Sequence, residues 1–596
     1  MRTAEAVLDV IRNRSSKGLH LDEDVYRQLY NPLLYLQAYS RIYKNDGALT
    51  QGVTEETADG MSRAKIESII EQLHAERFRW TPVRRVEIPK KNGKMRPLGI
   101  PTWTDKLVQE VIRSMLEAFY EPRFSVHSHG FRPGRGCHTA LAEIYRTWKG
   151  VHWFIEGDIR GCFDNIDHDI LLAIIREDLR DNRFLRLLES LLKAGYCEQW
   201  NYSPTLSGTP QGGIVSPILS NIYLDRLDKF VEQTLIPEYT RGEERQEHPE
   251  YVKLVKLAWY YRSVGKHEKA EELSKQYHQM PSRDFHDPNS RRLLYARYAD
   301  DFLLGLAGPV AEAREIKERL KTFLLEELHL EMSEEKTLIT HATTQAAKFL
   351  GYEITVAQED SKRTKGQRTV NGVIQLRVPQ RFVEDRCACY MRSGKPIHRP
   401  ERMSDEDFSI VAAYQAEYRG YVQFYSLAVN IAKLNKLRWV MWSSLLRTLA
   451  NKHKASTRKI GERYIKAVKF PHGIRKCIEV LVERDGKKPL VARFGGIPLK
   501  RNVKATMSDQ QLLQWKPKRS ELLQRLLADK CEICGKVGNI EVHHIRALKD
   551  VNVKGRKVKP LWMQIMSARR RKTLMVCRKC HENIQYGRPM VQQKRD

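Results

Sequence analysis

The sequence lacks any apolar run long enough to cross a bilayer, and it is poor in cysteine. No stretch of 18 or more apolar residues occurs in its 596 residues, so we expect no membrane-spanning helix. Residues 1–6 lack a secretory signal's apolar core, and the acidic Glu5 argues against a transit peptide. The 10 cysteines are few and unevenly spread, which excludes a secreted disulfide scaffold. We therefore expect a soluble, cytoplasmic protein.

Acidic residues are also in deficit. The chain has 103 Lys+Arg against 73 Asp+Glu, a formal net charge of +30. Such an excess indicates a polyanionic partner, most often nucleic acid, although a merely basic surface is the alternative. With 41% hydrophobic residues the chain can build large cores, and its length allows about three to five domains.

Composition divides the chain into six segments, with no internal repeat or low-complexity tract. Short β-rich runs alternate with amphipathic helices in the second segment, so we expect a multidomain α+β protein. The segments are 1–80 (helical, polar), 81–358 (α/β, with a charged helical insertion near 236–291), 359–378 (polar linker), 379–475 (strongly helical), 476–527 (basic) and 528–596 (cysteine-bearing).

Paired carboxylates give the sharpest chemical signal. Asp300 and Asp301 follow the β-prone run 293–298 and precede another apolar run, which predicts a hairpin turn between two strands. Asp158 ends a separate apolar strand, where a buried carboxylate needs a cation or hydrogen-bond partners. Each motif alone could be a solvated turn; together they predict the two-Mg²⁺ site of a nucleic-acid polymerase.

Two C-x-x-C pairs lie close to the end of the chain. Cys531, Cys534, Cys577 and Cys580 can bring four thiolates to one tetrahedral ion. This spacing predicts a structural Zn²⁺ site.

At this point the sequence resembles the reverse transcriptases encoded within group II introns, over about residues 60–355. The resemblance implies a right-hand-like fold of fingers and palm with an antiparallel sheet, a helical thumb and a small zinc-stapled HNH domain of ββα-metal type. The matching blocks occur in the family's order at 84–101, 129–136, 154–164, 207–217, 298–301, 334–337 and 349–352.

The resemblance also implies roles for residues outside the carboxylate motifs. Block 84–101 would form the fingers hairpin, with a tight turn at Asn92-Gly93, although a solvated basic hairpin is the alternative. Arg132 and Arg135 would approach the template, or merely shape a loop. The remaining implied roles are triphosphate or nucleotide binding by Lys90, Arg96, Gln211 and Lys336, sugar discrimination by Phe163, and the primer grip of Phe349, Leu350 and Gly351.

Four tyrosines at 414, 418, 421 and 425 share one helix face. On their own they indicate a core stripe. Within the segment 379–475 they resemble the thumb, or maturase, domain of intron-encoded proteins, in which exposed cations would meet structured RNA.

The cysteine tail resembles an HNH endonuclease. The resemblance implies that His543 and His581 bind a catalytic Mg²⁺ or Mn²⁺, and that His544 is the general base. Two positions depart from the family pattern: Lys572 or Thr573 stands where an asparagine is usual, and Gln585 where a last histidine is frequent.

The resemblance implies one function with three activities. The protein would copy RNA into DNA, assist splicing of its own intron and nick target DNA to prime reverse transcription during retrohoming. Its partners would be intron RNA (as a lariat ribonucleoprotein), double-stranded target DNA, an RNA template–DNA primer duplex and deoxynucleoside triphosphates, in a bacterial cytoplasm or an organelle. The alternatives are a splicing cofactor with a decayed polymerase, and a retron-type or defence-associated reverse transcriptase.

Overall fold

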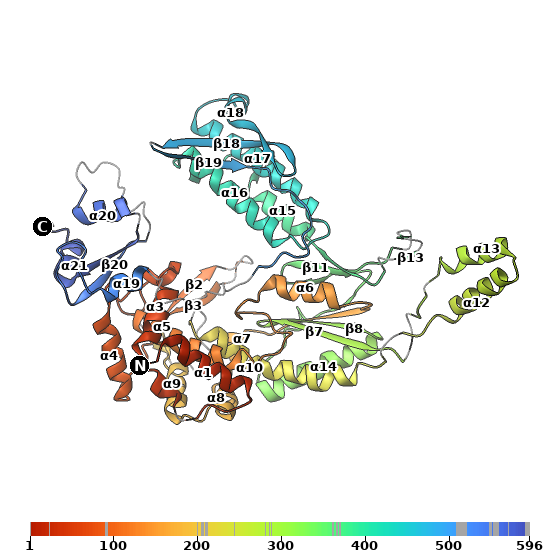
Figure 1. Cartoon of the computed structure of the whole chain (residues 1–596), viewed down its shortest axis with the longest axis horizontal. Helices are drawn as coiled ribbons and strands as arrows, with labels where there is room; N and C mark the ends of the chain where they lie inside the picture. Colours follow the sequence, from red (N-terminus) through yellow and green to blue (C-terminus); the bar gives the residue numbers. More distant parts are fainter. Residues whose placement is uncertain are drawn as a thin grey trace.

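The structure is a computed structural model of the chain. It describes residues 2–22, 24–89, 93, 95–198, 201–203, 208, 213–242, 245–280, 282–284, 287, 289–359, 363–364, 367–368, 371–484, 486–507, 521–546, 551, 559–569 and 571–589. Three parts rise from or extend a large α/β body (Figure 1): a helical module, the cysteine-bearing module and a helical hairpin. Within the described residues, no helix has the length and apolarity to span a membrane.

The N-terminal region is helical, and several of its helices begin at side-chain caps. Thr3, Asn31 and Ser62 each accept a hydrogen bond from a backbone N–H in the first turn that follows. The elements are α1 (Ala4–Ser16), α2 (Val25–Gln28), α3 (Pro32–Ile42), the 3₁₀ turn η1 (Asp46–Leu49), β1 (Met61–Ser62) and α4 (Arg63–His74).

A β-hairpin follows at the predicted position. Strand β2 (Val83–Pro89) pairs antiparallel with β3 (Met95–Ile100), and Gly93 has the positive φ of 79° that a tight turn requires. Lys90 and Asn92 lie outside the described residues. The sheet has order β3-β2-β5-β6, completed by β5 (Tyr196–Glu198) and β6 (Asn201–Ser203).

The central sheet is wholly antiparallel, with order β7-β8-β4-β9. Its strands are β4 (Trp153–Asp158), β7 (Arg292–Tyr298), β8 (Asp301–Ala307) and β9 (Ile339–His341). The helices of this body are α5 (Trp103–Tyr120), α6 (Cys137–Thr147), α7 (Cys162–Asn165), α8 (His168–Asp178), α9 (Asn182–Leu192), α10 (Ser216–Phe230), the π-helical turn η2 (Val231–Leu235), α11 (Ile236–Glu238) and α14 (Val310–Leu328).

The segment 236–291 is an excursion from this body. Helices α12 (Pro249–Ser263) and α13 (His267–Tyr277) form a hairpin that extends away from the sheet (Figure 1). The backbones of Arg241 and Arg291 form an isolated antiparallel β-bridge. The excursion therefore leaves and rejoins the body at one place.

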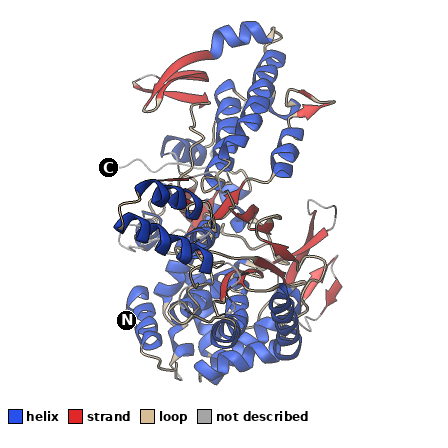
Figure 2. Ribbon diagram, turned by 90° about the vertical axis from the view of Figure 1, so that its right-hand side faces the viewer, coloured by secondary structure: helices blue, strands red, loops and turns tan. Residues whose placement is uncertain are grey.

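A small sheet of β10 (Ala347–Phe349), β11 (Tyr352–Val356) and β14 (Ile374–Arg377) leads to the helical module; β12 (Arg363–Thr364) and β13 (Gln367–Arg368) form a separate ribbon. The module contains α15 (Gln380–Ala388), β15 (Met391–Arg392), β16 (Lys395–Pro396), η3 (Pro400–Arg402), α16 (Asp407–Phe424), η4 (Ile431–Lys433), α17 (Leu434–Lys452), α18 (Thr457–Tyr464), β17 (Ile465–Phe470), β18 (Gly473–Arg484) and β19 (Lys487–Phe494). Figure 2 shows it standing clear of the body.

We expected helices throughout 379–475, but the last part of this range is not helical. Residues 465–494 form a three-stranded sheet. The boundary expected at 475/476 falls inside β18. This sheet packs on α16 through Phe494, whose ring lies 5.9 Å from that of Tyr418. Tyr414, Tyr418 and Tyr425 are buried, so most of the tyrosine stripe is core.

The cysteine-bearing module consists of α19 (Glu521–Leu527), β20 (Ile540–His544), α20 (Leu561–Arg569), β21 (Thr573–Cys577) and α21 (Arg578–Gln585). Strand β20 pairs with β21 on one side and with the N-terminal β1 on the other, giving the order β1-β20-β21. Buried side chains of this module, such as Leu523 and Met575, belong to one apolar cluster with N-terminal residues such as Met61 and Tyr39. The module is therefore docked on the N-terminal region.

Candidate polymerase and endonuclease sites

The three predicted acids come together at one end of the central sheet. Asp158 lies opposite Asp301 in the β4–β8 ladder, and Asp300 stands in the turn between β7 and β8. Burial and the charges of Asp300 and Asp158 raise the pKa of Asp301 to about 7. Burial and Asp158 likewise raise the pKa of Asp300. Three crowded carboxylates of this kind are a hard-oxygen donor set that suits Mg²⁺.

Lys336 neutralises part of this charge. Its Nζ donates to Asp158 Oδ1 at 2.9 Å and to Oδ2 at 2.8 Å. The Lys336 side chain is 67% exposed, so it reaches the carboxylate from the solvent side. The hydrogen bond to Asp158 outweighs partial burial and raises the pKa of Lys336. The hairpin also places Arg96 of β3 near the acids. Its positive charge opposes the rise in the pKa of Asp300.

A buried ion pair that sequence reasoning missed holds the acidic turn. Arg297 is fully buried, lies 2.5 Å from Asp228 of α10 and donates from Nη1 to the carbonyl oxygen of Ala299 at 2.9 Å. Ala299 has the left-handed φ of 55°. A Cβ atom on Gly130 would lie 2.4 Å from the Ala299 nitrogen, so the loop at Gly130 closes tightly on the turn. In the sequence, only the presence of an arginine directly before Tyr298 could have indicated this ion pair.

Phe163 is half-buried on α7, five residues beyond Asp158. Its ring lies 6.3 Å from that of Phe131, which in turn lies 6.4 Å from Tyr298 beside the acids. Gly208 meets the same short helix so closely that a Cβ atom there would lie 2.5 Å from the Asp164 carbonyl oxygen. Gln211, from the same sequence block, lies outside the described residues.

The two predicted template arginines shape a loop. Arg132 is buried, pairs with Glu121 and donates to the carbonyl oxygen of Ser128 at 2.7 Å. Arg135 donates to the carbonyl oxygens of Val126 and Ser128. The structural alternative therefore holds for Arg132, whose cation is engaged inside the protein.

Phe349 ends β10, and Leu350 and Gly351 form the turn to β11. Leu350 and Gly351 have positive φ angles of 49° and 74°. The hydroxyl of Tyr425, at the end of α16, donates to the Gly351 carbonyl oxygen at 3.0 Å. This contact ties the turn to the helical module.

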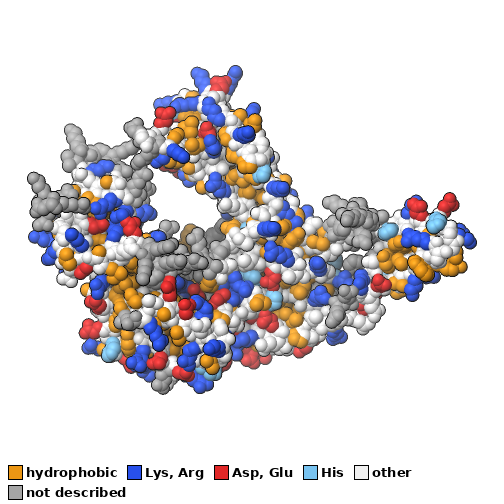
Figure 3. All heavy atoms as spheres, viewed as in Figure 1, with side chains coloured by type: hydrophobic (Ala, Val, Ile, Leu, Met, Phe, Trp, Pro, Cys, Tyr) orange, Lys and Arg blue, Asp and Glu red, His pale blue; other side chains and the backbone are white. Residues whose placement is uncertain are grey.

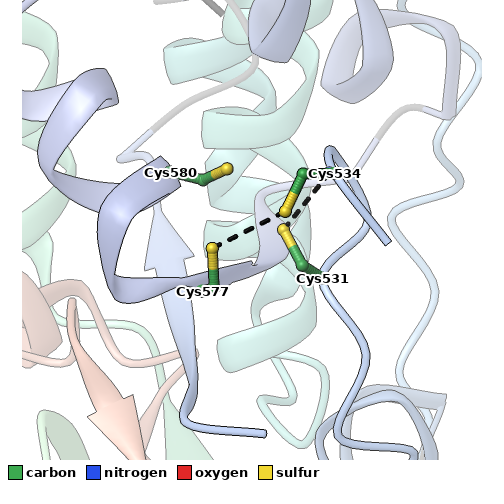
Figure 4. A group of neighbouring side chains, drawn as sticks. All are labelled: Cys531, Cys534, Cys577 and Cys580. Carbon is green, nitrogen blue, oxygen red and sulfur yellow. Dashed lines mark hydrogen bonds between the residues drawn. The ribbon is translucent and has the colours of Figure 1, made fainter. Parts of the chain in front are cut away.

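Cys531 and Cys534 of one loop face Cys577, at the end of β21, and Cys580, in α21 (Figure 4). Their sulfur atoms all lie within 4.8 Å of one another, and Cys534 Sγ is 3.7 Å from Cys577 Sγ. Zn–S bonds of about 2.3 Å in a tetrahedron separate sulfurs by about 3.8 Å. Burial and the neighbouring thiols raise the pKa of Cys580, so the thiolates need a cation. The residues fit zinc.

The predicted endonuclease histidines also meet, but with residues from the N-terminal region. Asp59 lies against both His543 and His581. Burial opposes ionisation of Asp59, but the hydrogen bonds and charges of His543 and His581 outweigh it. They hold the pKa of the Asp59 carboxyl below its ordinary range. Burial likewise opposes the charged form of His581, but hydrogen bonds to Asp59 and Glu541 raise its pKa to about 9.

His544 is buried and neutral, because burial lowers its pKa to about 4. Its Nε2 lies 2.7 Å from the hydroxyl oxygen of Tyr39 on α3. Asp59 and Tyr39 belong to no motif, so sequence reasoning missed both. Thr573 lies in strand β21 and Gln585 ends α21, at the two departures from the family pattern.

Comparison with known families covers each of these parts. Residues 88–261 match the reverse transcriptases (RNA-dependent DNA polymerases), residues 379–472 the type II intron maturases, and residues 531–581 the AI2M/AI1M-like HNH endonucleases. The three matches define a reverse transcriptase joined to a maturase and an HNH endonuclease.

Relatives match over nearly the whole chain. The group II intron-encoded protein LtrA of Lactococcus lactis subsp. cremoris is 39% identical over 607 residues, covering 98% of this chain and 99% of that protein. The uncharacterized 91 kDa protein in the cob intron of Schizosaccharomyces pombe is 33% identical, covering 96% of this chain and 71% of that protein. The chain therefore belongs to the family of group II intron-encoded proteins.

Proposed function

We propose that Asp158, Asp300 and Asp301 hold two Mg²⁺ ions for RNA-directed DNA synthesis. The observation that carries this proposal is the ladder pairing of Asp158 with Asp301 beside Asp300, with raised pKa values at both turn acids. When bound, the ions supply activation of the primer 3′-hydroxyl and neutralisation of the pyrophosphate. Arg297 and Asp228 keep the turn carboxylates in position.

The cations and rings around the acids would select and grip the incoming nucleotide. We assign Lys90, Arg96 and Lys336 to the triphosphate and Gln211 to the nucleotide pocket. When cations bind Asp158, the ion pair between Lys336 and Asp158 would break and Lys336 would bind the pyrophosphate instead. Its exposed side chain has room for this movement. Phe163 would reject a ribose 2′-hydroxyl by a steric clash.

The primer would be held by Phe349, Leu350 and Gly351, next to the helical module. We assign residues 1–80 and 81–358 to fingers and palm, and 359–378 to a linker. The thumb and maturase domain would run from 379 through β19, since that sheet packs on α16. The HNH domain would run from α19 onward, with 528–596 as its core.

The exposed surface of the maturase domain suits intron RNA. Trp439 on α17 is 61% exposed and offers a ring for base stacking. Exposed cations lie along α16, α17, α18 and β17: Arg419, Lys436, Lys454, Arg458, Lys459, Arg463, Lys466 and Lys469. In Figure 3 the blue side chains spread over this module and its neighbours, and the surface is open between the module and the HNH part.

At the C-terminus we propose a structural Zn²⁺ on Cys531, Cys534, Cys577 and Cys580, and a catalytic Mg²⁺ or Mn²⁺ on His543 and His581. His544 would accept the proton of the attacking water. The ribonucleoprotein would act on double-stranded target DNA, in the cytoplasm and on the nucleoid if the source is bacterial.

The test combines the activities in one tube. The protein is purified with its intron lariat RNA and incubated with labelled target DNA, Mg²⁺ and deoxynucleoside triphosphates. We expect one strand to be nicked and its new 3′ end to be extended into cDNA. Extension of an added primer without nicking would contradict the endonuclease assignment, and nicking without extension would contradict the polymerase site.

A further inference from the structure

The N-terminal region contributes a strand to the endonuclease module. Met61 and Ser62 of β1 pair with Val542 and Glu541 of β20, the strand that carries His543 and His544. The Gly60 N–H donates to the Val542 carbonyl oxygen at 3.0 Å. Asp59 is therefore held in register beside the histidines by backbone hydrogen bonds, not by a side-chain contact alone.

Asp59 approaches both metal-ligand candidates at once. Its Oδ1 lies 3.3 Å from His543 Nδ1, and its Oδ2 lies 3.2 Å from His581 Nε2. The three ligand atoms all lie within 4.8 Å of one another. Two atoms bonded to one ion at about 2.1 Å, with an angle between 90° and 110°, are about 3.0 to 3.4 Å apart. Each of the two separations, one through each Asp59 oxygen, matches that of two ligands on one ion.

The histidine environments point the same way. His581 Nδ1 lies 2.6 Å from Glu541 Oε2, so that carboxylate orients the ring and leaves Nε2 facing Asp59. His543 is only 7% exposed, yet within the described part of the chain neither of its ring nitrogens makes a hydrogen bond of normal geometry. Buried polar atoms are rarely left in this state without a ligand.

We propose that Asp59 is a third protein ligand of the endonuclease ion, so that the nuclease centre is shared between the N-terminal region and the HNH domain. This inference rests on the proposed endonuclease function and adds to it a residue that lies outside the HNH domain. The backbone N–H of His544 donates to Asp59 Oδ1 at 2.7 Å, which links the ligand directly to the general base.

The general base of this centre, His544, borders a pocket. This pocket of about 860 Å³ lies between the end of α3 and the HNH module. Five cations border it, Lys44, Arg525, Arg546, Arg571 and Lys572, against one acid, Glu521. The positive border suits a DNA phosphate that approaches His544 between the two parts.

The test compares Asp59→Ala and Asp59→Asn with the unaltered protein, in full-length chain bound to intron RNA. Asp59→Asn keeps the size and the acceptor for the His544 N–H but removes the charge. Glu55→Gln, an exposed acid in the same segment, is the matched control. We expect both Asp59 variants to lose more than about 100-fold in nicking rate, while primer extension and zinc content stay unchanged and Glu55→Gln behaves as the unaltered protein.

Ion placement is read separately by loading Fe²⁺ in place of the divalent ion and mapping peptide-bond cleavage by the hydroxyl radicals that it generates. Cuts are expected near residues 59, 543 and 581 and near 158 and 301. In Asp59→Ala only the first set should disappear.

Unchanged nicking with unaltered cuts would overturn the assignment. Faster nicking would also overturn it, because Asp59 would then be an inhibitory contact. If the unaltered protein does not nick at all, the proposed endonuclease function fails, whereas the cleavage map still tests Asp59 as a ligand.

Discussion

The two proposed catalytic metal sites of this protein are assembled in contrasting ways. The polymerase acids sit on adjacent strands of one antiparallel sheet, where the β4–β8 register sets Asp158 opposite Asp301. The candidate endonuclease residues come from two distant parts of the chain and meet through the pairing of β1 with β20 and the shared apolar cluster. The first site depends on local strand pairing, and the second on the docking of two regions. Substitutions that separate the HNH module from the N-terminal region should therefore abolish nicking and leave DNA synthesis unchanged.

The largest effect is expected from Asp301→Ala. Removing one of three clustered carboxylates should lower cDNA synthesis by more than about 100-fold, because the ions lose a direct ligand. Intron splicing and DNA nicking should persist, since neither uses this turn. Primer extension, splicing and nicking assays on one preparation check this; joint loss of all three would indicate a structural role instead.

Cys577→Ser should break the other half of the comparison. Structural zinc contributes folding energy directly, so the HNH module should lose its fold together with bound zinc. Nicking should vanish while primer extension stays within about twofold of the unaltered protein, because the polymerase acids are held by the pairing of β4, β7 and β8, which no described residue of the HNH module enters. Zinc content and protease resistance of residues after 521 provide the measurement. Cys389→Ser, at an exposed cysteine far from this site, serves as the control.

Arg297→Met probes how the polymerase turn is held. The substitution leaves Asp228 buried without its partner, which should cost about 3 to 5 kcal/mol of stability. Arg160→Met removes an exposed ion pair with Glu331 and should cost less than about 1 kcal/mol. Thermal unfolding of the two variants side by side measures the difference. Equal melting temperatures would mean that the buried pair does not stabilise the turn.

The smallest effect is expected from Phe163→Val, which trims the proposed sugar gate. Ribonucleotide incorporation should rise by about tenfold or more relative to deoxynucleotides, with little change in nicking. Template extension with each nucleotide type, using Phe131→Leu as the neighbouring-ring control, gives the ratio. Unaltered sugar discrimination would remove Phe163 from the gate.

Sequence reasoning anticipated features governed by short-range rules. Asn92-Gly93 indicated the hairpin that joins β2 and β3, and Asp300-Asp301 between apolar runs indicated the turn between β7 and β8. The two C-x-x-C pairs indicated the cysteine cluster, because each pair already brings two sulfurs near one point. In each case the information lies within a few residues of chain.

The same reasoning failed where long-range packing decides. The helical pattern to residue 475 gave no warning of the sheet that packs Phe494 onto α16. For Arg132 the sequence left a template contact and a loop role open, and its burial beside Glu121 favours the loop role. Asp59 belongs to no sequence motif, and its proposed role rests on the pairing of β1 with β20.

The sequence by itself determined the family and the order of the domains and indicated most of the candidate catalytic residues, since these depend on residue type and spacing along the chain. Only the tertiary structure decided that Arg297 and Asp228 support the acidic turn, and that Tyr39 and Asp59 lie against the endonuclease histidines. Those contacts join segments far apart in the chain, and their energy comes from burial and hydrogen bonds that exist only once the parts have docked.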